Sequence, residues 1–186
     1  MRAEAQAARL LKKAGVTQAP VPVERLARAC GAQVRQVPFE GNLSGLLYRE
    51  SEGAIIGVNS LHASTRRRFT IAHELGHLVL EHIPMQSQSE GGALHVDRRF
   101  LWRDDRSSKA TDPQEIQANA FAAALLMPRD MLKRDFMALR KEMGDFDLED
   151  DEVVRALADR YKVSLQAMLI RLNNLNLIQP ETGHSD

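Results

Sequence analysis

The spacing of hydrophobic positions changes along the first third of the chain from helical to strand-like. Residues 3–14 and 21–31 repeat apolar positions with helical periodicity, and a glycine marks the end of each stretch. Shorter apolar runs follow at 32–39, 43–50 and 54–59, with a turn-forming segment between the last two. The pattern predicts two helices followed by a small sheet that contains an antiparallel hairpin.

The middle of the chain alternates between long helical patterns and polar breaks. A helix is predicted over residues 63–80, and a second over 113–127, where Asp112 suits the capping position before it. Between them, the segment 84–93 contains glycine, glutamine and serine and predicts a loop. The apolar run at 94–102 then predicts an edge strand of the sheet.

The last third of the chain is predicted to be helical. Residues 128–143 form one helical pattern, and an acidic link follows at 144–152. Residues 153–178 then predict two or three short helices, and 157–178 carry the apolar spacing of a helix-turn-helix. We therefore expect an α+β fold in two parts. Residues 1–143 would form the first domain with a small twisted sheet, and residues 144–186 a helical C-terminal subdomain packed on it.

Composition and charge exclude several classes of protein. Hydrophobic residues make up 44% and charged residues 27% of the 186-residue chain, as in ordinary globular domains. The 25 Lys and Arg residues balance 25 Asp and Glu residues, so no basic field favours direct binding of nucleic acid. Cys30 is the single cysteine, which excludes an internal disulfide framework. The sequence shows no signal-like core and no membrane-spanning apolar run, so we expect a cytoplasmic protein.

The predicted central helix carries the motif His73-Glu74-Leu75-Gly76-His77. Residues four apart on a helix differ by about 40° in direction, so His73 and His77 can direct ring nitrogens at one ion. Glu74 projects about 100° away from His73, which suits a base acting on water beside that ion. The alternative is an ordinary amphipathic helix with two histidines. Apolar neighbours favour burial of the motif, and buried paired histidines need partners.

A catalytic zinc site usually has three protein ligands, so a third ligand must be found. On a continuous helix His82 lies about 180° around from His73, and it is set aside as a helix-end residue. A metzincin-type third histidine is excluded, because Leu80 and Ile83 stand at the positions that require glycine and histidine. Glu81 lies on the ligand side, but at the fraying end of the helix.

Glu115, near the start of the next helix, is the better candidate for the third ligand. The small residues that follow it permit close packing of the two helices: Ala118, Ala120, Ala122, Ala123 and Ala124. Asn119 lies on the same face as Glu115, where its side-chain oxygen can accept the second ring N–H of a ligand histidine. The alternative is that Glu115 is a first-turn acid favoured by the helix dipole and Asn119 a polar surface residue.

Residues 66–82, "RRRFTIAHELGHLVLEH", and 115–128, "EIQANAFAAALLMP", together resemble the two signature segments of the ImmA/IrrE family of metallopeptidases. Two separated motifs agree in order and distance, and the resemblance extends from about residue 21 to residue 178. It implies a zincin-like metallopeptidase core with a gluzincin-like zinc site. Manganese is the alternative to zinc as the native metal.

The resemblance also implies roles for particular residues and a substrate. His73, His77 and Glu115 would bind zinc, and Glu74 would activate the water. Family members are associated with site-specific cleavage of helix-turn-helix repressors of the Xre type, which relieves repression in stress response or in induction of phages and mobile elements. The expected partner is therefore a protein substrate of this type.

Peptide hydrolysis also needs a hydrogen-bond donor for the oxyanion besides the metal. Tyr48, His62 and His95 are the candidate donors, and each is also explained as a structural residue. A purely structural zinc site is disfavoured, because such sites have four ligands and usually use several cysteines.

The C-terminal helical pattern indicates an alternative function, which is DNA binding. It is mildly basic, and its second helix would present Arg171 and Asn173 to a DNA groove. This alternative is a non-catalytic regulator or antitoxin-like interaction module with a DNA-binding C-terminus. The sequence favours the peptidase, because the reading helix offers only one arginine and two asparagines.

Overall fold

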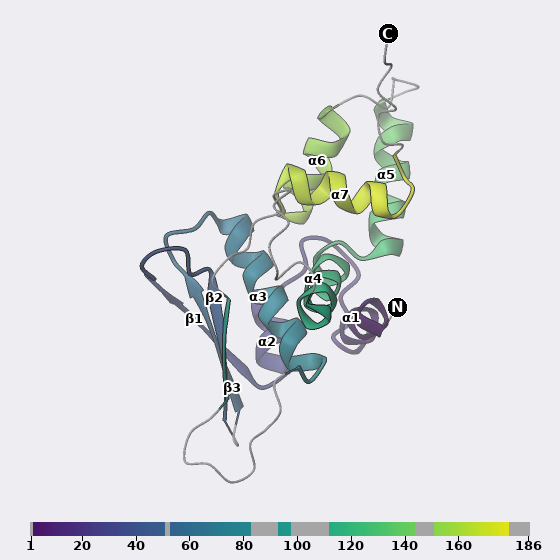
Figure 1. Ribbon diagram of the computed structural model, residues 1–186. Helices are drawn as coiled ribbons and strands as arrows, with labels where there is room; N and C mark the ends of the chain where they lie inside the picture. Colours follow the sequence, from purple (N-terminus) through teal and green to yellow (C-terminus); the bar gives the residue numbers. More distant parts are fainter. Residues whose placement is uncertain (1, 51–52, 83–92, 98–111, 144–150, 179–186) are drawn as a thin grey trace.

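A computed structural model describes residues 2–50, 53–82, 93–97, 112–143 and 151–178 (Figure 1). Its elements in chain order are α1 (Arg2–Lys13), α2 (Val23–Ala29), β1 (Ala32–Val37), β2 (Gly45–Glu50), β3 (Gly53–Asn59), α3 (Ser64–Val79), β4 (Ala93–Asp97), α4 (Pro113–Leu126), α5 (Arg129–Met143), α6 (Asp151–Tyr161) and α7 (Leu165–Asn174). The predicted α+β fold is confirmed, with the early helices, the sheet and both motif helices where the apolar spacing places them.

The four strands form one mixed sheet in the order β1-β3-β2-β4. β1 runs parallel to β3, whereas β2 pairs antiparallel with both β3 and β4, so the predicted hairpin is β2–β3. Leu47 of β2 lies opposite Ile56 of β3 and opposite His95 of β4, which puts these three side chains on one face of the sheet. The predicted edge strand is confirmed as β4 up to Asp97. The remainder of that prediction, and most of the predicted loop before it, lie outside the described residues.

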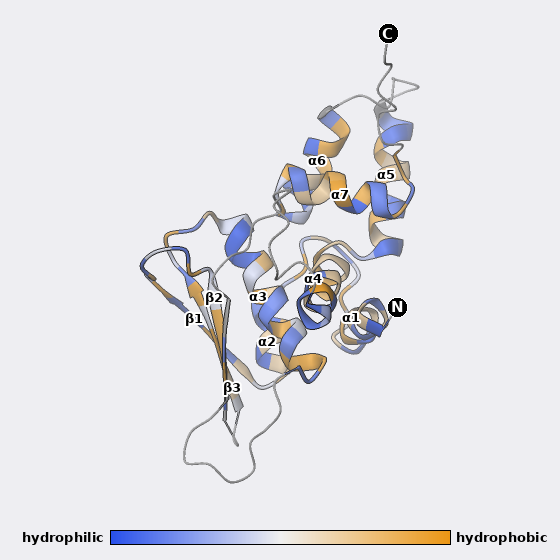
Figure 2. Cartoon of the chain, viewed as in Figure 1, coloured by the Kyte–Doolittle hydropathy of each residue, from blue (hydrophilic) through white to orange (hydrophobic). Residues whose placement is uncertain are grey.

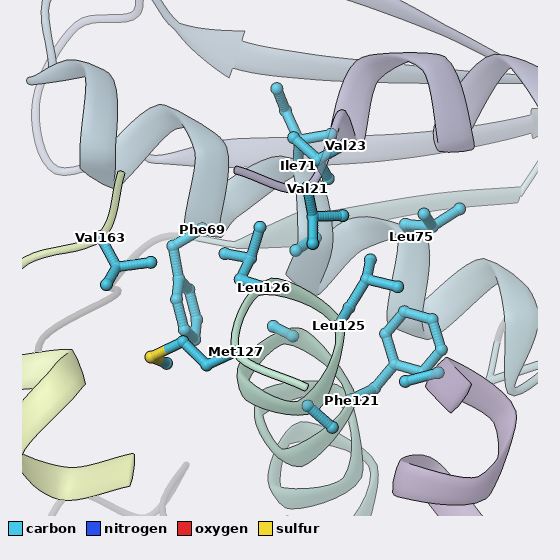
Figure 3. Close-up of a cluster of buried hydrophobic side chains, with 14 of the residues drawn as sticks. Val21, Val23, Phe69, Ile71, Leu75, Phe121, Leu125, Leu126, Met127 and Val163 are labelled. Atoms are coloured by element: carbon cyan, nitrogen blue, oxygen red, sulfur yellow. The ribbon is translucent and has the colours of Figure 1, made fainter. Parts of the chain in front are cut away.

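Helices cover one face of the sheet in successive layers. α2 and α3 lie against the strands, α4 packs on α3, and α1 packs on α4 (Figure 1). Figure 3 shows the core between α3 and α4, where Leu75 lies near Leu125 and Phe121, and Phe69 lies near Met127. All five are buried, and burying a side chain of this size contributes about 1.5–3 kcal/mol. The hydrophobic core therefore holds together the two helices that carry the candidate ligands.

α3 and α4 approach each other closely because small residues face each other at their crossing. A Cβ atom added to Gly76 would lie 3.2 Å from both the Cα and the carbonyl oxygen of Ala118. Ala118 and Ala122 are fully buried. The predicted close packing of the alanine-rich helix is thus present, and it sets the separation at which side chains on the two helices can meet.

The three C-terminal helices, α5, α6 and α7, lie together at one end of the molecule (Figure 1). The Tyr161 hydroxyl donates a 2.9 Å hydrogen bond to Asp135, which ties α6 to α5. Val163, in the turn before α7, is buried next to Phe69 of α3 (Figure 3). Figure 2 shows hydrophobic residues along the strands of the sheet and in the middle of α7. The predicted boundary near residue 144 falls in a segment outside the described residues, so the division into domains stays a prediction.

Among the described residues, the helices are too short or too polar for any of them to cross a bilayer.

Candidate metal centre

α3 brings the motif residues into the interior. His73 and Glu74 are fully buried and His77 is 1% exposed, as the apolar residues around them predict. The Nε2 atoms of His73 and His77 lie 3.1 Å apart, one helical turn from each other. Two imidazoles of one helix therefore direct the same ring nitrogen at one point.

α4 supplies a carboxylate to the same point. Asp112 caps this helix by accepting a 2.8 Å hydrogen bond from the Gln114 N–H, so Glu115 lies in the first turn. The Glu115 carboxylate oxygens lie 3.3 Å from His73 Nε2 and 3.3 Å from His77 Nε2. Ligands bound tetrahedrally at zinc distances of about 2.0–2.2 Å are about 3.3–3.6 Å apart. The three side chains fit a single ion of this kind.

The outer nitrogens of both rings have polar partners. His73 Nδ1 lies 2.9 Å from Asn119 Oδ1, an acceptor, so Nδ1 carries the proton and the lone pair of Nε2 is directed toward His77 and Glu115. His77 Nδ1 lies 3.2 Å from Nδ1 of His82. Two ring lone pairs and a carboxylate thus converge in a buried space, and a cation is the partner that such a donor set requires.

The ionisation of the surrounding groups agrees with this arrangement. Burial raises the pKa of the Glu115 carboxyl, but hydrogen bonds and charge from His73 and His77 outweigh it and hold the pKa well below its usual value. Burial lowers the pKa of His82, which favours its neutral ring. The centre therefore offers an ionised carboxylate beside a neutral ring that can accept a hydrogen bond.

His95 joins the group from the edge strand β4. Its Nε2 lies 3.5 Å from a Glu115 oxygen, and its ring stacks at 4.2 Å on the ring of His77. The His95 side chain is 24% exposed, whereas His73 and His77 are buried. Among the described residues, the group able to hold a metal ion consists of His73, His77, His95 and Glu115, whose ligand atoms lie within 4.8 Å of one another.

Glu74 projects from the motif helix toward strand β2. A Cβ atom added to Gly45 would lie 3.2 Å from Glu74 Oε1 and 2.3 Å from Thr70 Cγ2, a separation that real atoms do not adopt. Only glycine at position 45 therefore lets the strand pass this close to Glu74. The close approach keeps the carboxylate buried beside the ligand residues on the same helical turn.

Several residues considered from the sequence are placed away from this centre. Tyr48 alternates with Leu47 along β2, so its side chain is on the opposite face of the sheet. His62 precedes the first residue of α3, and the helix from Ser64 to His73 alone spans about 14 Å. The structure brings neither candidate oxyanion donor to the cluster. Glu81, the other carboxylate considered as a third ligand, is exposed and is not part of the group.

The placement of His82 corrects the sequence expectation. A continuous helix would turn His82 away from the ligands, but α3 ends at Val79 and Glu81 adopts a positive φ of 59°. This reversal returns the His82 ring to His77. The polar residues after the motif indicate that the helix can end early. The sequence does not predict the direction in which the chain turns after that end.

Comparison with known proteins identifies the family. The model of the Peptidase_M78 family, described as the IrrE N-terminal-like domain, matches residues 27–173. The chain belongs to this family. The predicted membership of the ImmA/IrrE family is confirmed, and with it a zincin-like α+β fold with a His and Glu group that could hold a metal ion.

The other comparisons add the fold of one solved structure. No curated protein matches the sequence of this Peptidase_M78 member. A structure titled Mycobacterium tuberculosis transcriptional regulator matches with a TM-score of 0.57 at 17% sequence identity, over 99% of this chain and 49% of the other. The chain thus spans about half the length of that regulator. At this identity the likeness concerns the fold alone.

Sequence reasoning missed two features of this Peptidase_M78 centre. No pattern in the sequence marked Gly45 as part of the site, because position 45 requires glycine only through its contact with Thr70 and Glu74 of α3. His95 was considered only as an oxyanion donor, and its place among the possible metal ligands follows from the register of β4 against β2. Both features depend on pairing between distant segments, which no local pattern reports.

Proposed function

We propose that this chain is a zinc-dependent endopeptidase that cleaves a helix-turn-helix repressor of the Xre type inside the cell and so relieves repression. The observation that carries the peptidase assignment is the meeting of the buried His73 and His77 with the partly buried Glu115, with Glu74 on the same helical turn as the two histidines. A three-ligand set leaves room at the ion for water, and an acid beside it provides the base.

Each residue of the motif has a distinct task in this mechanism. His73, His77 and Glu115 would hold the ion, and zinc, when bound, supplies Lewis-acid chemistry that lowers the pKa of water from about 15.7 to about 7. Glu74 takes a proton from the attacking water as the water oxygen bonds to the scissile carbonyl carbon. It then delivers that proton to the leaving nitrogen as the C–N bond breaks.

His95 is the donor best placed to stabilise the carbonyl oxygen as it gains negative charge. Of the three candidates from the sequence, it alone lies beside the ligand residues, 3.5 Å from Glu115. Its side chain is also 24% exposed, whereas the ligand histidines are buried, although the Nε2 atom itself is buried. Donors aimed at a developing oxyanion contribute about 2.7–4 kcal/mol to catalysis.

The repressor substrate rests on the family resemblance of the two signature segments. Recognition of a folded or partly opened repressor, rather than of a short peptide motif, would provide specificity. The competing DNA-binding function has little support, because Arg171 is only 6% exposed and its guanidinium is bonded within the chain. An arginine engaged in this way is not available to a DNA groove.

The test compares the parent protein with Glu74→Gln, using Glu81→Gln as a matched control on the exposed turn after the same helix. Purified Xre-type repressors encoded near the gene are incubated with each zinc-loaded protein, and the products are analysed by gel and mass spectrometry. We expect one specific cut by the parent and by Glu81→Gln, and none by Glu74→Gln with its zinc retained.

Two outcomes would contradict the proposal. Undiminished cleavage by Glu74→Gln would remove the assigned base, and cleavage of unstructured peptides as fast as the repressor would remove the proposed specificity. Metal analysis of the purified parent distinguishes zinc from manganese in the same preparation.

A further inference from the structure

We propose that His82 is a positioning residue, which fixes the tautomer of His77 and so presents its Nε2 lone pair to the metal. The inference rests on the proposed function, because it assigns His77 as a ligand. Its basis is the 3.2 Å separation between the Nδ1 atoms of His82 and His77. The two rings meet edge to face, with centroids 5.1 Å apart and planes at 75°.

The end of α3 explains how His82 reaches this place. The N–H of Glu81 donates to the carbonyl of Leu78 at 3.3 Å, and the N–H of His82 donates to the carbonyl of His77 at 3.0 Å. These two bonds, with Glu81 at a φ of 59°, form a Schellman motif. In that motif the residue after the left-handed position contacts the residue five before it, and here those two residues are His82 and His77.

The proton on each ring follows from what each nitrogen faces. His77 Nε2 lies 3.3 Å from a Glu115 oxygen and must be free of its proton to bind a cation. The proton of a neutral His77 ring is then on Nδ1, which donates to Nδ1 of His82. His82 therefore accepts through Nδ1 and carries its own proton on Nε2.

The same arrangement is present at the other ligand histidine. His73 donates from Nδ1 to Asn119 of α4, just as His77 donates from Nδ1 to His82. The side chain of Gln117, also on α4, is a further hydrogen-bond partner of His82 and raises the pKa of its ring, against the larger effect of burial. Each ligand ring is thus oriented by a polar group outside the coordination sphere, and α4 helps to support both.

The experiment tests whether His82 acts as a hydrogen-bond acceptor for His77 or only packs against its ring. His82→Phe keeps a ring and removes the acceptor, whereas His82→Asn removes the ring and keeps an oxygen near the former Nδ1 position. His62→Ala is the matched control, because His62 lies at the opposite end of α3. Zinc affinity of each full-length protein is measured by competition with a chromogenic chelator, and circular dichroism of the zinc-free proteins verifies folding.

We expect zinc affinity to fall about 10- to 100-fold in His82→Phe, the range known for groups that orient metal ligands. His82→Asn should recover most of that loss, and His62→Ala should bind zinc like the parent. In the zinc-free parent, ¹⁵N NMR of the His77 ring should show the proton on Nδ1, with a shift toward the other tautomer in His82→Phe.

The proposal is overturned if folded His82→Phe binds zinc as tightly as the parent, or if Phe and Asn variants lose affinity equally, since shape and not the acceptor would then matter. Absence of zinc binding by the parent would overturn this inference together with the proposed function. Tight binding by the parent and weak binding by His82→Phe, without any peptide cleavage, would support this inference and reject the peptidase. The two can therefore fail separately.

Discussion

The two ends of α4 hold buried polar groups in opposite ways. At its N-terminal end, Glu115 and Asn119 meet the histidines of α3, and the Nε2 atoms of His73 and His77 converge on the Glu115 carboxylate. At its C-terminal end, the carbonyl of Met127 accepts a 3.1 Å hydrogen bond from Arg171 of α7. One end offers a set of ligand atoms that could hold a cation, whereas the other is completed by partners within the chain.

The C-terminal end shows what a structural buried charge looks like. Arg171 donates from Nη1 to Glu4 at 2.8 Å and from Nε to Met127, which joins α7 to α1 and to the end of α4. A buried guanidinium with a carboxylate and a carbonyl as partners needs no ligand. The candidate metal centre differs because two ring nitrogens and a carboxylate face one another at separations that suit a single ion, and this difference separates a candidate functional cluster from a structural one.

The largest expected effect comes from removing the carboxylate at the N-terminal end of α4. Glu115→Gln should lower zinc affinity by more than about 100-fold, above the range of residues that only orient ligands, because a neutral amide replaces an ionised ligand. The loss of zinc affinity is measured by metal content and by competition with a chelator, with Glu81→Gln as the control. Zinc binding equal to that of the parent would show that Glu115 is a structural acid like Glu4.

A smaller effect on catalysis is expected from crowding Glu74 without touching a ligand. In Gly45→Ala the new methyl group collides with Thr70 and lies 3.2 Å from Glu74 Oε1, so the carboxylate is displaced. Because a 1 Å misplacement can reduce rate by about 100-fold, kcat should fall by up to about that factor while zinc is retained.

Thr70→Ser tests the cause of that loss, because it removes the Cγ2 atom that the added methyl group would meet. The double variant Gly45→Ala/Thr70→Ser should recover part of the kcat in steady-state assays. Equal kcat in the parent and in Gly45→Ala would show that the close approach of β2 has no part in positioning Glu74.

At the C-terminal end of α4, loss of the arginine should affect stability and leave the metal site intact. Arg171→Met leaves the buried Met127 carbonyl without its donor, and unfolding in urea should show a loss of about 2–3 kcal/mol. Zinc affinity should match that of the parent. A fall in zinc affinity with unchanged stability would mean that the two ends of α4 are coupled, contrary to the comparison.

The smallest expected effect is that of Glu4→Gln, since Glu4 is 39% exposed and solvent screens its ion pair with Arg171. We expect a loss of under about 1 kcal/mol at neutral pH. The hydrogen bond to Arg171, its largest cause, lowers the pKa of Glu4 in the folded protein. The stability difference from the parent should therefore persist above the ordinary glutamate pKa of about 4.3 and disappear as the pH falls below it.

Thermal unfolding of the parent and of Glu4→Gln across pH 3 to pH 7, on the order of one measurement per pH unit, would record this difference. A difference that grows toward acid pH would have the wrong sign for a lowered carboxyl pKa. The same series on Arg171→Met should show no contribution from this pair at any pH.

The amino-acid sequence by itself determined the elements and the two ligands that share a helix. Apolar spacing is local, so α1 to α4 and the β2–β3 hairpin were readable, and the four-residue spacing of His73 and His77 places both rings on one side of α3 whatever surrounds them. The capping residue Asp112 likewise marked the start of α4, and with it the position of Glu115 in the first turn.

Tertiary structure decided which other groups meet these ligands, because that depends on contacts between segments far apart in the chain. The packing of Gly76 on Ala118 selects Glu115 over Glu81, and the strand register brings in His95. The left-handed turn after α3 recruits His82, which helical geometry alone had placed on the wrong side. The same reason applies to Arg171, whose partners on α1 and α4 turn an apparent DNA-reading residue into a buried structural one.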